Sequence, residues 1–283
     1  MERVAFEIFD KQVYWYGIFT ALGFLAGYFF VMKNRCFAKM TKDEPANLVM
    51  LAAIAGIVGA RLFYVVQFWD EQFANKPFGS IFRIDQGGQV FYGGFILAVI
   101  TIVVFCKIKK LSILGVLDVL APSLAIGHAL GRIGCFINGC CYGLPTKCAI
   151  SIKYSVGNYP AVKYHNTPLH AVQLYEALAN VALFALLMYT IRKFKTGFTV
   201  GLYFVCYGFL RYIMEANFRG DHIELVKNEF TKAEIVGMII IPIGIALMVV
   251  SYYINNRSVL RSAGEFENID DSKENLENKK NKR

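Results

Sequence analysis

The sequence predicts an all-α, polytopic membrane protein with seven transmembrane helices, an external N-terminus and a cytoplasmic C-terminus. Among its 283 residues, 56% are hydrophobic and 18% are charged, and the mean hydropathy is +0.43. Soluble domains carry about 25% charged residues, so this composition excludes an ordinary soluble domain. Hydrocarbon offers the backbone no hydrogen bonds, and each crossing must therefore be a helix of about 20 mostly apolar residues.

Seven apolar stretches are candidates for such crossings, although the third and the sixth are short. They are Tyr14 to Met32, Ala46 to Trp69, Val90 to Phe105, Leu111 to Ile137, His170 to Ile191, Phe198 to Met214 and Ala233 to Ile254. The first stretch follows the acidic residues Glu2, Glu7 and Asp10 and has no small-residue cleavage pattern, unlike a signal peptide. We expect it to remain as a helix.

Basic residues gather beyond the ends of the odd-numbered stretches. They are Lys33, Arg35, Lys39, Lys42, Lys107, Lys109, Lys110, Arg192, Lys193, Lys195, Arg257 and Arg261. Cytoplasmic loops retain positive charge, so this pattern predicts the stated orientation. The net charge of +9 then reflects topology, with a further attraction to anionic lipid headgroups of about 1 kcal/mol per residue, and we expect no nucleic-acid partner.

Residues 1 to 262 are expected to form one transmembrane domain, because the sequence contains no solenoid-type period and no clean duplication. Residues 263 to 283 have almost no apolar side chain after Ile269 and cannot bury enough surface to offset the entropy of ordering. We therefore expect a disordered, charged cytoplasmic tail.

Three arginines lie inside the apolar stretches, at Arg61, Arg132 and Arg211. An arginine at the centre of a bilayer costs about 2.5 to 3.5 kcal/mol on insertion scales, so each needs a partner or a wet cavity. One interpretation is structural ion pairing with the acidic residues Asp118, Glu176 and Glu215. The other is a ligand site, and for Arg61 the sequence favours neither.

Arg132 and Arg211 are better candidates for ligand binding, because the topology places both near the outer ends of their helices. Two guanidinium groups at the headgroup level, beside glycine-rich backbone, suit a phosphate. A phosphate at that depth belongs to a phospholipid, which we expect as a partner together with other membrane lipid.

Aromatic residues at the same level are usually interfacial belt residues, and Tyr14 and Trp15 fit that role. Tyr16 and Tyr92 differ because each directly precedes glycine, where backbone can approach a ligand closely.

The motifs "YWYGIFTALGF", "GARLFYVVQFW", "GGQVFYGGFILA", "GRIGCFINGCCYG", "HAVQLYEAL" and "YGFLRYIMEANFR" resemble, in order and spacing, those of the prolipoprotein diacylglyceryl transferase family. The resemblance runs from about Tyr14 to Arg219. It implies a multi-pass enzyme of the bacterial plasma (inner) membrane, without a cofactor. Such an enzyme moves diacylglyceryl from phosphatidylglycerol to the lipobox cysteine thiol of prolipoprotein signal peptides, the first step of lipoprotein maturation, and releases glycerol phosphate.

The resemblance also implies site residues, with arginines holding the phosphate of the leaving group. The lipid-binding or catalytic positions are Tyr16, Arg132, Asn138, Gly143 and Arg211, and the surrounding polar network is Arg61, Gln173, Glu176 and Glu215. The substrate thiol must lose a proton to become a nucleophile, so a base is needed.

The chain departs from the family pattern at the expected base. Tyr92 stands where the family has a histidine, and a tyrosine with a pKa of about 10 is a poor base at neutral pH. His128 lies one helical turn before Arg132, on the same face, and we hypothesise that it takes over the base or proton-relay role. The alternative is a structural histidine bonded to backbone or to Asp118.

Cys135 and Cys140 also replace the family's usual asparagine and glutamate, and Cys141 and Cys148 lie nearby in sequence. We expect no metal, because "CFINGCC" lacks C-x-x-C spacing and adjacent cysteines rarely reach one tetrahedral ion. A disulfide between Cys148 and Cys140 or Cys141 is one alternative in an oxidising exterior. A cysteine that carries the diacylglyceryl group transiently is another.

Two further functions remain open. One is a related phospholipid-dependent transferase with a different acceptor. The other is an anion or lipid transporter, because buried arginines also line transport paths, although the sequence has no inverted repeat.

Overall fold

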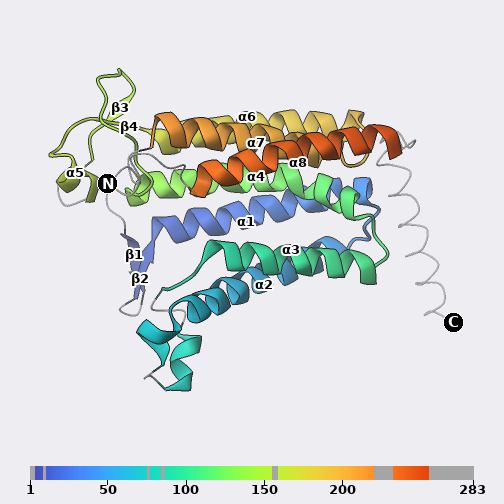
Figure 1. Cartoon of the computed structure of the whole chain (residues 1–283), viewed down its shortest axis with the longest axis horizontal. Helices are drawn as coiled ribbons and strands as arrows, with labels where there is room; N and C mark the ends of the chain where they lie inside the picture. Colours follow the sequence, from blue (N-terminus) through green and yellow to red (C-terminus); the bar gives the residue numbers. More distant parts are fainter. Residues whose placement is uncertain are drawn as a thin grey trace.

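The computed structural model describes residues 4–8, 11–74, 77–83, 87–154, 159–219 and 232–254, and the fold in this part is mostly helical (Figure 1). The long helices are α1 (Trp15–Asn34), α2 (Glu44–Gln67), α3 (Phe91–Ile108), α4 (Ile113–Asn138), α6 (Val172–Lys193), α7 (Phe198–Asn217) and α8 (Lys232–Ile254). Each begins and ends within a few residues of an apolar stretch expected from the sequence. Residues 263–283, expected to be disordered, lie outside the described residues.

Six of the described helices are long and apolar enough to cross a membrane, namely α1, α2, α3, α4, α6 and α8, with α1 extended to Ala38 and α8 restricted to Ile235–Tyr253. The helix α7 is 20 residues long but is not among them, and it carries Arg211 and Glu215. The fold is therefore that of a multi-pass membrane protein.

Glycine pairs allow neighbouring helices to approach closely. A Cβ atom on Gly59 of α2 would lie 2.5 Å from the carbonyl oxygen of Gly93 in α3, and one on Gly244 of α8 would lie 2.6 Å from that of Gly201 in α7. Backbones this close leave no room for a larger residue, as in small-residue interfaces between membrane helices. The glycine after Tyr92 therefore serves helix packing, rather than the approach of a ligand expected from the sequence.

The helix α4 lies between α1 on one side and α6 and α7 on the other (Figure 1). Its N-terminus is capped by Ser112, whose side chain accepts a hydrogen bond from Gly115 N at 3.3 Å. Its C-terminus is closed by Gly139 in the left-handed region (φ 72°), the conformation that favours glycine at helix ends. Residues of α4 consequently face helices from both halves of the chain.

Asp118 of α4 stabilises the start of α7 instead of pairing with an arginine. Its two carboxylate oxygens accept hydrogen bonds from the backbone N–H groups of Gly197 (2.5 Å) and Val200 (2.8 Å). Free N–H groups at a helix N-terminus favour an acidic partner. The interpretation of Asp118 as an ion-pair partner is therefore wrong for the described residues.

Short irregular elements gather at one end of the bundle, beside the C-terminus of α4 (Figure 1). They are β1 (Val4–Ile8), β2 (Lys11–Tyr14), β3 (Ser151–Ile152), β4 (Leu169–His170) and the five-residue helix α5 (Tyr159–Lys163). The two antiparallel strand pairs were not predicted, because an all-α pattern was expected throughout. At the opposite end the 3₁₀ turn η1 (Arg35–Ala38) follows α1.

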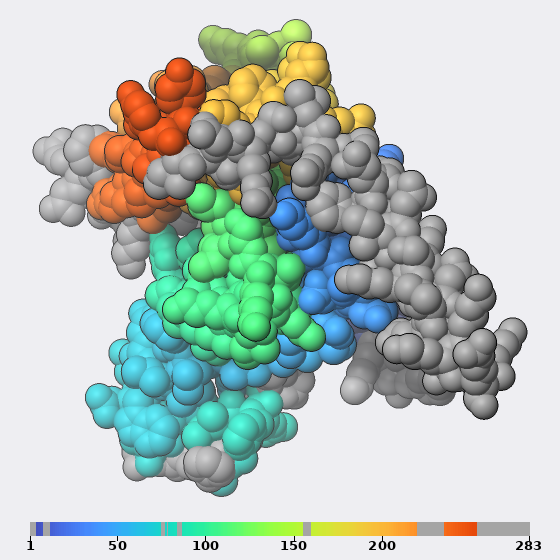
Figure 2. Space-filling model, turned by 90° about the vertical axis from the view of Figure 1, so that its right-hand side faces the viewer, coloured from blue at the N-terminus to red at the C-terminus, as the bar shows by residue number. Residues whose placement is uncertain are grey.

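The π-helical turn η2 (Trp69–Phe73) and the 3₁₀ turn η3 (Phe78–Phe82) follow α2. This segment, cyan to teal, projects from the helices in two views at right angles (Figures 1 and 2). It belongs to the α2–α3 part of the molecule and lies apart from α6, α7 and α8.

Candidate active site

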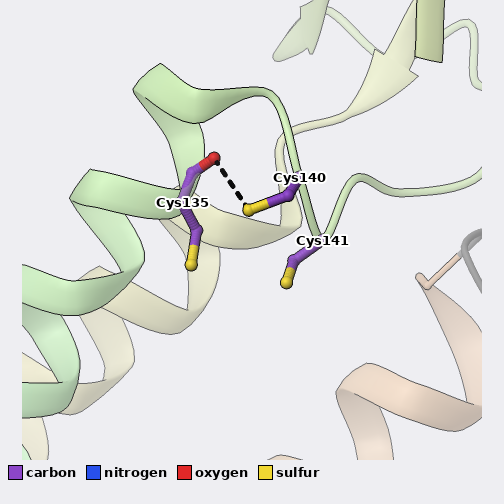
Figure 3. A group of neighbouring side chains, drawn as sticks. All are labelled: Cys135, Cys140 and Cys141. Carbon is purple, nitrogen blue, oxygen red and sulfur yellow. Dashed lines mark hydrogen bonds between the residues drawn. The ribbon is translucent and has the colours of Figure 1, made fainter. Parts of the chain in front are cut away.

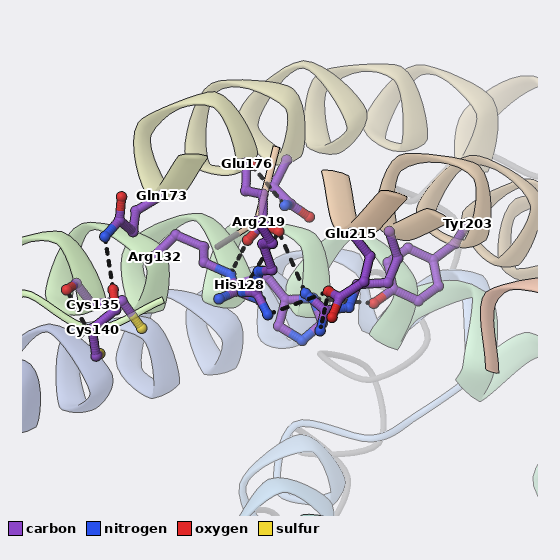
Figure 4. A network of polar contacts seen from close by, with 11 residues as sticks. His128, Arg132, Cys135, Cys140, Gln173, Glu176, Tyr203, Glu215 and Arg219 are labelled. Atoms are coloured by element: carbon purple, nitrogen blue, oxygen red, sulfur yellow. Dashed lines mark hydrogen bonds and ion pairs between the residues drawn. The ribbon is translucent and has the colours of Figure 1, made fainter. Parts of the chain in front are cut away.

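Three helices bring charged side chains together near the end of the bundle that carries the strands. Arg132 comes from α4, Glu176 from the first turns of α6, and Glu215 from the last turns of α7 (Figure 4). Arg211 lies one turn before Glu215 on α7. Arg219, two residues beyond the end of α7, joins them. We call these five residues the arginine–glutamate cluster.

Glu176 is the centre of this cluster. Its Oε2 atom forms an ion pair with Arg132 Nε, and its Oε1 atom lies 3.5 Å from Arg211 Nη1 and 3.8 Å from Arg219 Nη2. Glu215 Oε2 lies 3.1 Å from Arg211 Nη2 and 3.5 Å from Arg219 Nη1. The expected convergence of Arg132 and Arg211 therefore occurs through one shared carboxylate, and the acidic partners Glu176 and Glu215 fit the ion-pair interpretation as well.

The cluster contains more positive than negative charge, with three arginines against two glutamates. The Arg219 side chain is only 5% exposed, and its Nε and Nη2 atoms make no hydrogen bond to the described residues. The 3.8 Å separation from Glu176 is an ion-pair contact, too long for a hydrogen bond. A buried site with an excess guanidinium charge is electrostatically suited to an anion.

A small pocket opens beside the cluster. It is lined by His128, Arg132, Glu176, Asn180, Tyr207, Leu210 and Arg211. The side chains of Arg132 and Arg211 are 20% and 17% exposed, in contrast to the buried Arg219. Because Arg132 meets Glu176 through Nε, its terminal Nη groups are the ones that can meet a ligand.

His128 lines this pocket and contacts tyrosines of α7. Its Nδ1 atom is 3.3 Å from the hydroxyl oxygen of Tyr203, and its ring stacks on Tyr207 with a centroid distance of 5.0 Å. The two tyrosine rings also stack on one another. The partner of His128 is therefore Tyr203, and neither Asp118 nor a backbone carbonyl has that role among the described contacts.

Arg219 is the site residue that sequence reasoning missed. The residues Tyr203, Tyr207, Arg211 and Glu215 recur at every fourth position of α7, so neighbours in this series lie one turn apart, and Arg219 follows at the same interval just beyond the helix. This spacing was visible in the motif "YGFLRYIMEANFR", where Arg219 is the last letter. It was missed because Arg219 lies beyond the apolar stretch.

Gln173 and Gly143 stabilise the loop that follows α4, next to the cluster. The fully buried amide of Gln173 donates hydrogen bonds to Cys140 O (2.7 Å) and to the Tyr154 hydroxyl (2.9 Å), and burial raises the pKa of Tyr154. Gly143 forms an antiparallel bridge with Arg219, and a Cβ atom there would lie 2.6 Å from His170 Cβ. Gly143 thus holds the loop against α6 and Arg219, and its lack of a side chain serves packing.

Arg61 lies outside the cluster, although it was expected in the same polar network. Its guanidinium donates to four backbone carbonyls, those of Ser80 (3.0 Å), Ile81 (2.7 Å), Gly87 (2.9 Å) and Gly88 (3.1 Å). It also lies over the ring of Tyr64. Arg61 therefore ties the segment after α2 to that helix.

The remaining predicted residues lie at the periphery. Tyr92 is 43% exposed at the start of α3, its ring meets Phe91, and its hydroxyl makes no hydrogen bond to the described residues. The backbone of Tyr16 packs against Gly134 of α4, 3.4 Å from the position of a Cβ atom. Asn138 is the last residue of α4 and is partly exposed. The structure thus brings Tyr16 and Asn138 to the same end of α4. Tyr92 makes no contact with the arginine–glutamate cluster among the described residues.

The cysteines at the end of α4 are close together. All seven cysteines are free thiols, and Cys148 is exposed. The sulfur atoms of Cys135, Cys140 and Cys141 all lie within 4.8 Å of one another (Figure 3). The spacing argument against a shared ion therefore fails for these three, and no disulfide joins Cys148 to the pair in this structure.

Fold and site together define a multi-pass membrane protein with a buried, cation-rich cluster beside a pocket near one end of its helices. The sequence model of the family described as "Prolipoprotein diacylglyceryl transferase" matches residues 3–250. The chain belongs to this family of membrane enzymes.

Individual relatives agree with that assignment. The chain is 38% identical over 218 residues to the phosphatidylglycerol–prolipoprotein diacylglyceryl transferase of Finegoldia magna, covering 76% of this chain and 83% of the relative. It is 34% identical to the enzyme of the same name from Clostridium tetani, over 78% and 86% of the two chains. Identity to that of Staphylococcus aureus is 32%, over 88% of each chain.

Proposed function

We propose that this protein transfers the diacylglyceryl group of phosphatidylglycerol to the lipobox cysteine thiol of prolipoproteins. The observation that carries the proposal is the arginine–glutamate cluster, in which Arg132 and Arg211 line a pocket and the guanidinium charge exceeds the carboxylate charge. The names and substrates of the curated relatives support the same reaction.

In the proposed reaction, the terminal Nη groups of Arg132 and the guanidinium of Arg211 hold the phosphate of the lipid. As the acceptor sulfur attacks the glyceryl carbon, the bond from that carbon to the phosphate oxygen breaks and glycerol phosphate leaves. Negative charge grows on the leaving oxygen, and fixed cations in a dry site stabilise this charge more than the ground state. Glu176 orients the two guanidinium groups through Arg132 Nε and Arg211 Nη1, and Glu215 orients Arg211 through Nη2.

His128 is the proposed proton acceptor. It lines the pocket next to Arg132, whereas Tyr92 makes no hydrogen bond to the cluster among the described residues. If Nδ1–H donates to the Tyr203 oxygen, Nε2 carries the free lone pair and can take a proton. Fixing one ring nitrogen in this way is a common means of setting the histidine tautomer.

The proposed topology has seven crossings of the bacterial inner membrane, with α7 as the sixth crossing and the N-terminus outside. Ion pairing of Arg211 with Glu176 and Glu215 lowers the cost of burying these charges in α7. Basic residues such as Lys33, Lys107 and Lys193 lie at helix ends opposite the strands, which favours a cytoplasmic location for that end.

The test uses full-length protein in nanodiscs that contain phosphatidylglycerol labelled in its glycerol headgroup. Adding a lipobox peptide should release labelled glycerol phosphate and increase the peptide mass by one diacylglyceryl group. A peptide with serine in place of the lipobox cysteine is the matched control and should release nothing. Release without peptide modification would indicate another acceptor, and absence of both from protein that still binds the lipid would favour a transporter and overturn the proposal.

A further inference from the structure

The local backbone explains why Cys135, Cys140 and Cys141 converge. The helix α4 ends at Asn138, and Gly139 reverses the chain, so that Cys140 N donates to Cys135 O at 3.2 Å. The Cys140 thiol returns over the same turn and lies 3.7 Å from that oxygen (Figure 3). Cys141 has a φ of 58°, a conformation that side chains rarely adopt. This left-handed residue lets neighbouring cysteines direct their sulfurs to one point.

We propose that these three cysteines bind a zinc ion through three thiolates and leave its fourth coordination position open. A Zn–S bond of about 2.3 Å gives tetrahedral S···S separations of about 3.8 Å. The sulfurs already lie within 4.8 Å of one another, so small side-chain rotations suffice. A donor set of thiols alone selects soft metals and excludes magnesium and calcium.

The surrounding charge matches the bound ion. Three thiolates and one Zn²⁺ carry a net charge of −1. Arg132 lies one turn before Cys135 on α4 and interacts electrostatically with both Cys135 and Cys141. The guanidinium of Arg132 thus lies close to the negative charge of the zinc–thiolate group and stabilises it.

The open position has a candidate ligand of the same chemistry, which is the acceptor thiol. This step rests on the proposed function. The acceptor thiol loses its proton on binding zinc, because a coordinating thiol is deprotonated outright, and the proton passes through water to His128, the proposed acceptor. Its sulfur then forms the bond to the glyceryl carbon as the bond from carbon to phosphate oxygen breaks. The product thioether leaves zinc together with the release of glycerol phosphate, and no electrons are gained or lost.

The half-buried positions of the cysteines suit such a step. Cys135 is buried, whereas Cys140 and Cys141 are partly exposed, so the ion would be anchored on α4 and reachable from the turn. Cys140 is also fixed through its backbone oxygen by the amide of Gln173 (Figure 4). The zinc would therefore lie about one turn from the arginine that holds the phosphate.

The first experiment measures metal binding by the full chain in detergent, after chelation and reloading with zinc. We expect about one zinc per chain in the wild-type protein, as for a single ion site, and its loss in the variant Cys135→Ser/Cys140→Ser/Cys141→Ser. The matched control, Cys36→Ser/Cys148→Ser/Cys206→Ser, should retain the ion. Equal zinc content in both triple variants would overturn the proposal.

Replacing zinc by Co²⁺ makes the site visible without any variant. Wild-type protein should gain the near-ultraviolet absorption of thiolate-to-cobalt charge transfer and the visible bands of tetrahedral cobalt. A wild-type spectrum without thiolate bands would contradict the site even if the triple variant failed to fold. Binding of Cu(I) alone, or a disulfide among the three cysteines on mild oxidation with no zinc binding, would also count against it.

The second experiment tests the fourth ligand in the absence of phosphatidylglycerol, so that no transfer is required. A lipobox peptide should shift the visible bands of the cobalt protein, and the serine-substituted peptide should not. No shift from either peptide would refute the acceptor role while leaving the metal site in place. Glycerol phosphate release by metal-free protein would likewise separate a failure of this inference from a failure of the proposed function.

Discussion

Arg61 and Arg132 are both arginines in membrane-spanning helices, yet their surroundings differ in kind. Arg61 is 8% exposed and its guanidinium is satisfied by four backbone carbonyls of the segment after α2. Arg132 is more exposed, pairs with one carboxylate and lines a pocket. A buried arginine therefore indicates a ligand site when its protein partners leave some guanidinium nitrogens available. When backbone carbonyls accept from those nitrogens, the arginine has a structural role.

The largest effect is expected from removing the central carboxylate. Glu176→Gln should lower the free energy of unfolding by about 3 to 5 kcal/mol, because it leaves buried guanidinium groups without their shared counter-charge. Thermal unfolding in detergent measures the change. The double variant Glu176→Gln/Arg219→Met removes one positive charge as well, and it should recover part of the loss. A single variant as stable as wild type would show that the cluster is not electrostatically coupled.

A change of arginine to lysine separates the two regions by activity. Arg132→Lys keeps the charge but loses the planar fork, and we expect a fall of about 100-fold to 1000-fold in kcat/KM for diacylglyceryl transfer. Arg61→Lys is the matched substitution and should stay within about threefold of wild type per folded molecule, since Arg61 does not line the pocket and its contacts are the same in the ground state and the transition state. Similar losses of kcat/KM in both variants would show that Arg61 and Arg132 do not differ in their role in the reaction.

His128 sharpens the comparison because it lies on the Arg132 side of the molecule. His128→Phe keeps the ring stacked on Tyr207 but removes the nitrogens, and transfer should fall about 100-fold, the usual range for a lost general base. Tyr92→Phe is the control, and it should retain nearly full activity. Full activity of the His128 variant alongside an inactive Arg132→Ala variant would eliminate the proton-acceptor role.

The smallest effect is expected on the Arg61 side. Arg61→Met removes the donor from four carbonyls, and the free energy of unfolding should fall by about 1 to 3 kcal/mol. Limited proteolysis should then cut the segment between α2 and α3 faster than in wild type. Unchanged proteolysis, with transfer activity lost, would move Arg61 into the reaction.

Much of the fold was predictable, because apolar length alone determines membrane helices. The stretch from Leu111 to Ile137 differs from α4 by only two residues at its start and one at its end. The α7 stretch was also identified, although Arg211 and Glu215 reduce its hydropathy. The small strands were not predictable, since pairs as short as Ser151–Ile152 with Leu169–His170 depend on tertiary contacts rather than on periodicity.

The site was predictable where helical spacing decides it, and not where loops do. Four-residue spacing placed His128 beside Arg132, and sequence motifs led to Glu176 and Glu215. The sequence could not reveal that Asp118 accepts hydrogen bonds from the N-terminus of α7. It also could not reveal that Arg61 donates to carbonyls of a segment some 20 residues away. The sequence also could not show that Cys141 has a positive φ angle and that this brings adjacent sulfurs together. Residue spacing does not determine the φ angle of a residue in a turn.

The glycine contacts give the molecule an uneven stiffness. Backbone meets backbone between α2 and α3, and again between α7 and α8, whereas α2 and α3 have few neighbours in the rest of the bundle. The pairs α2–α3 and α7–α8 should therefore each move as one rigid unit, because close backbone contact prevents the two helices from sliding past one another. The α2–α3 pair has few contacts with the other helices. Amide hydrogen exchange should therefore show different opening rates for this pair and for the rest of the bundle.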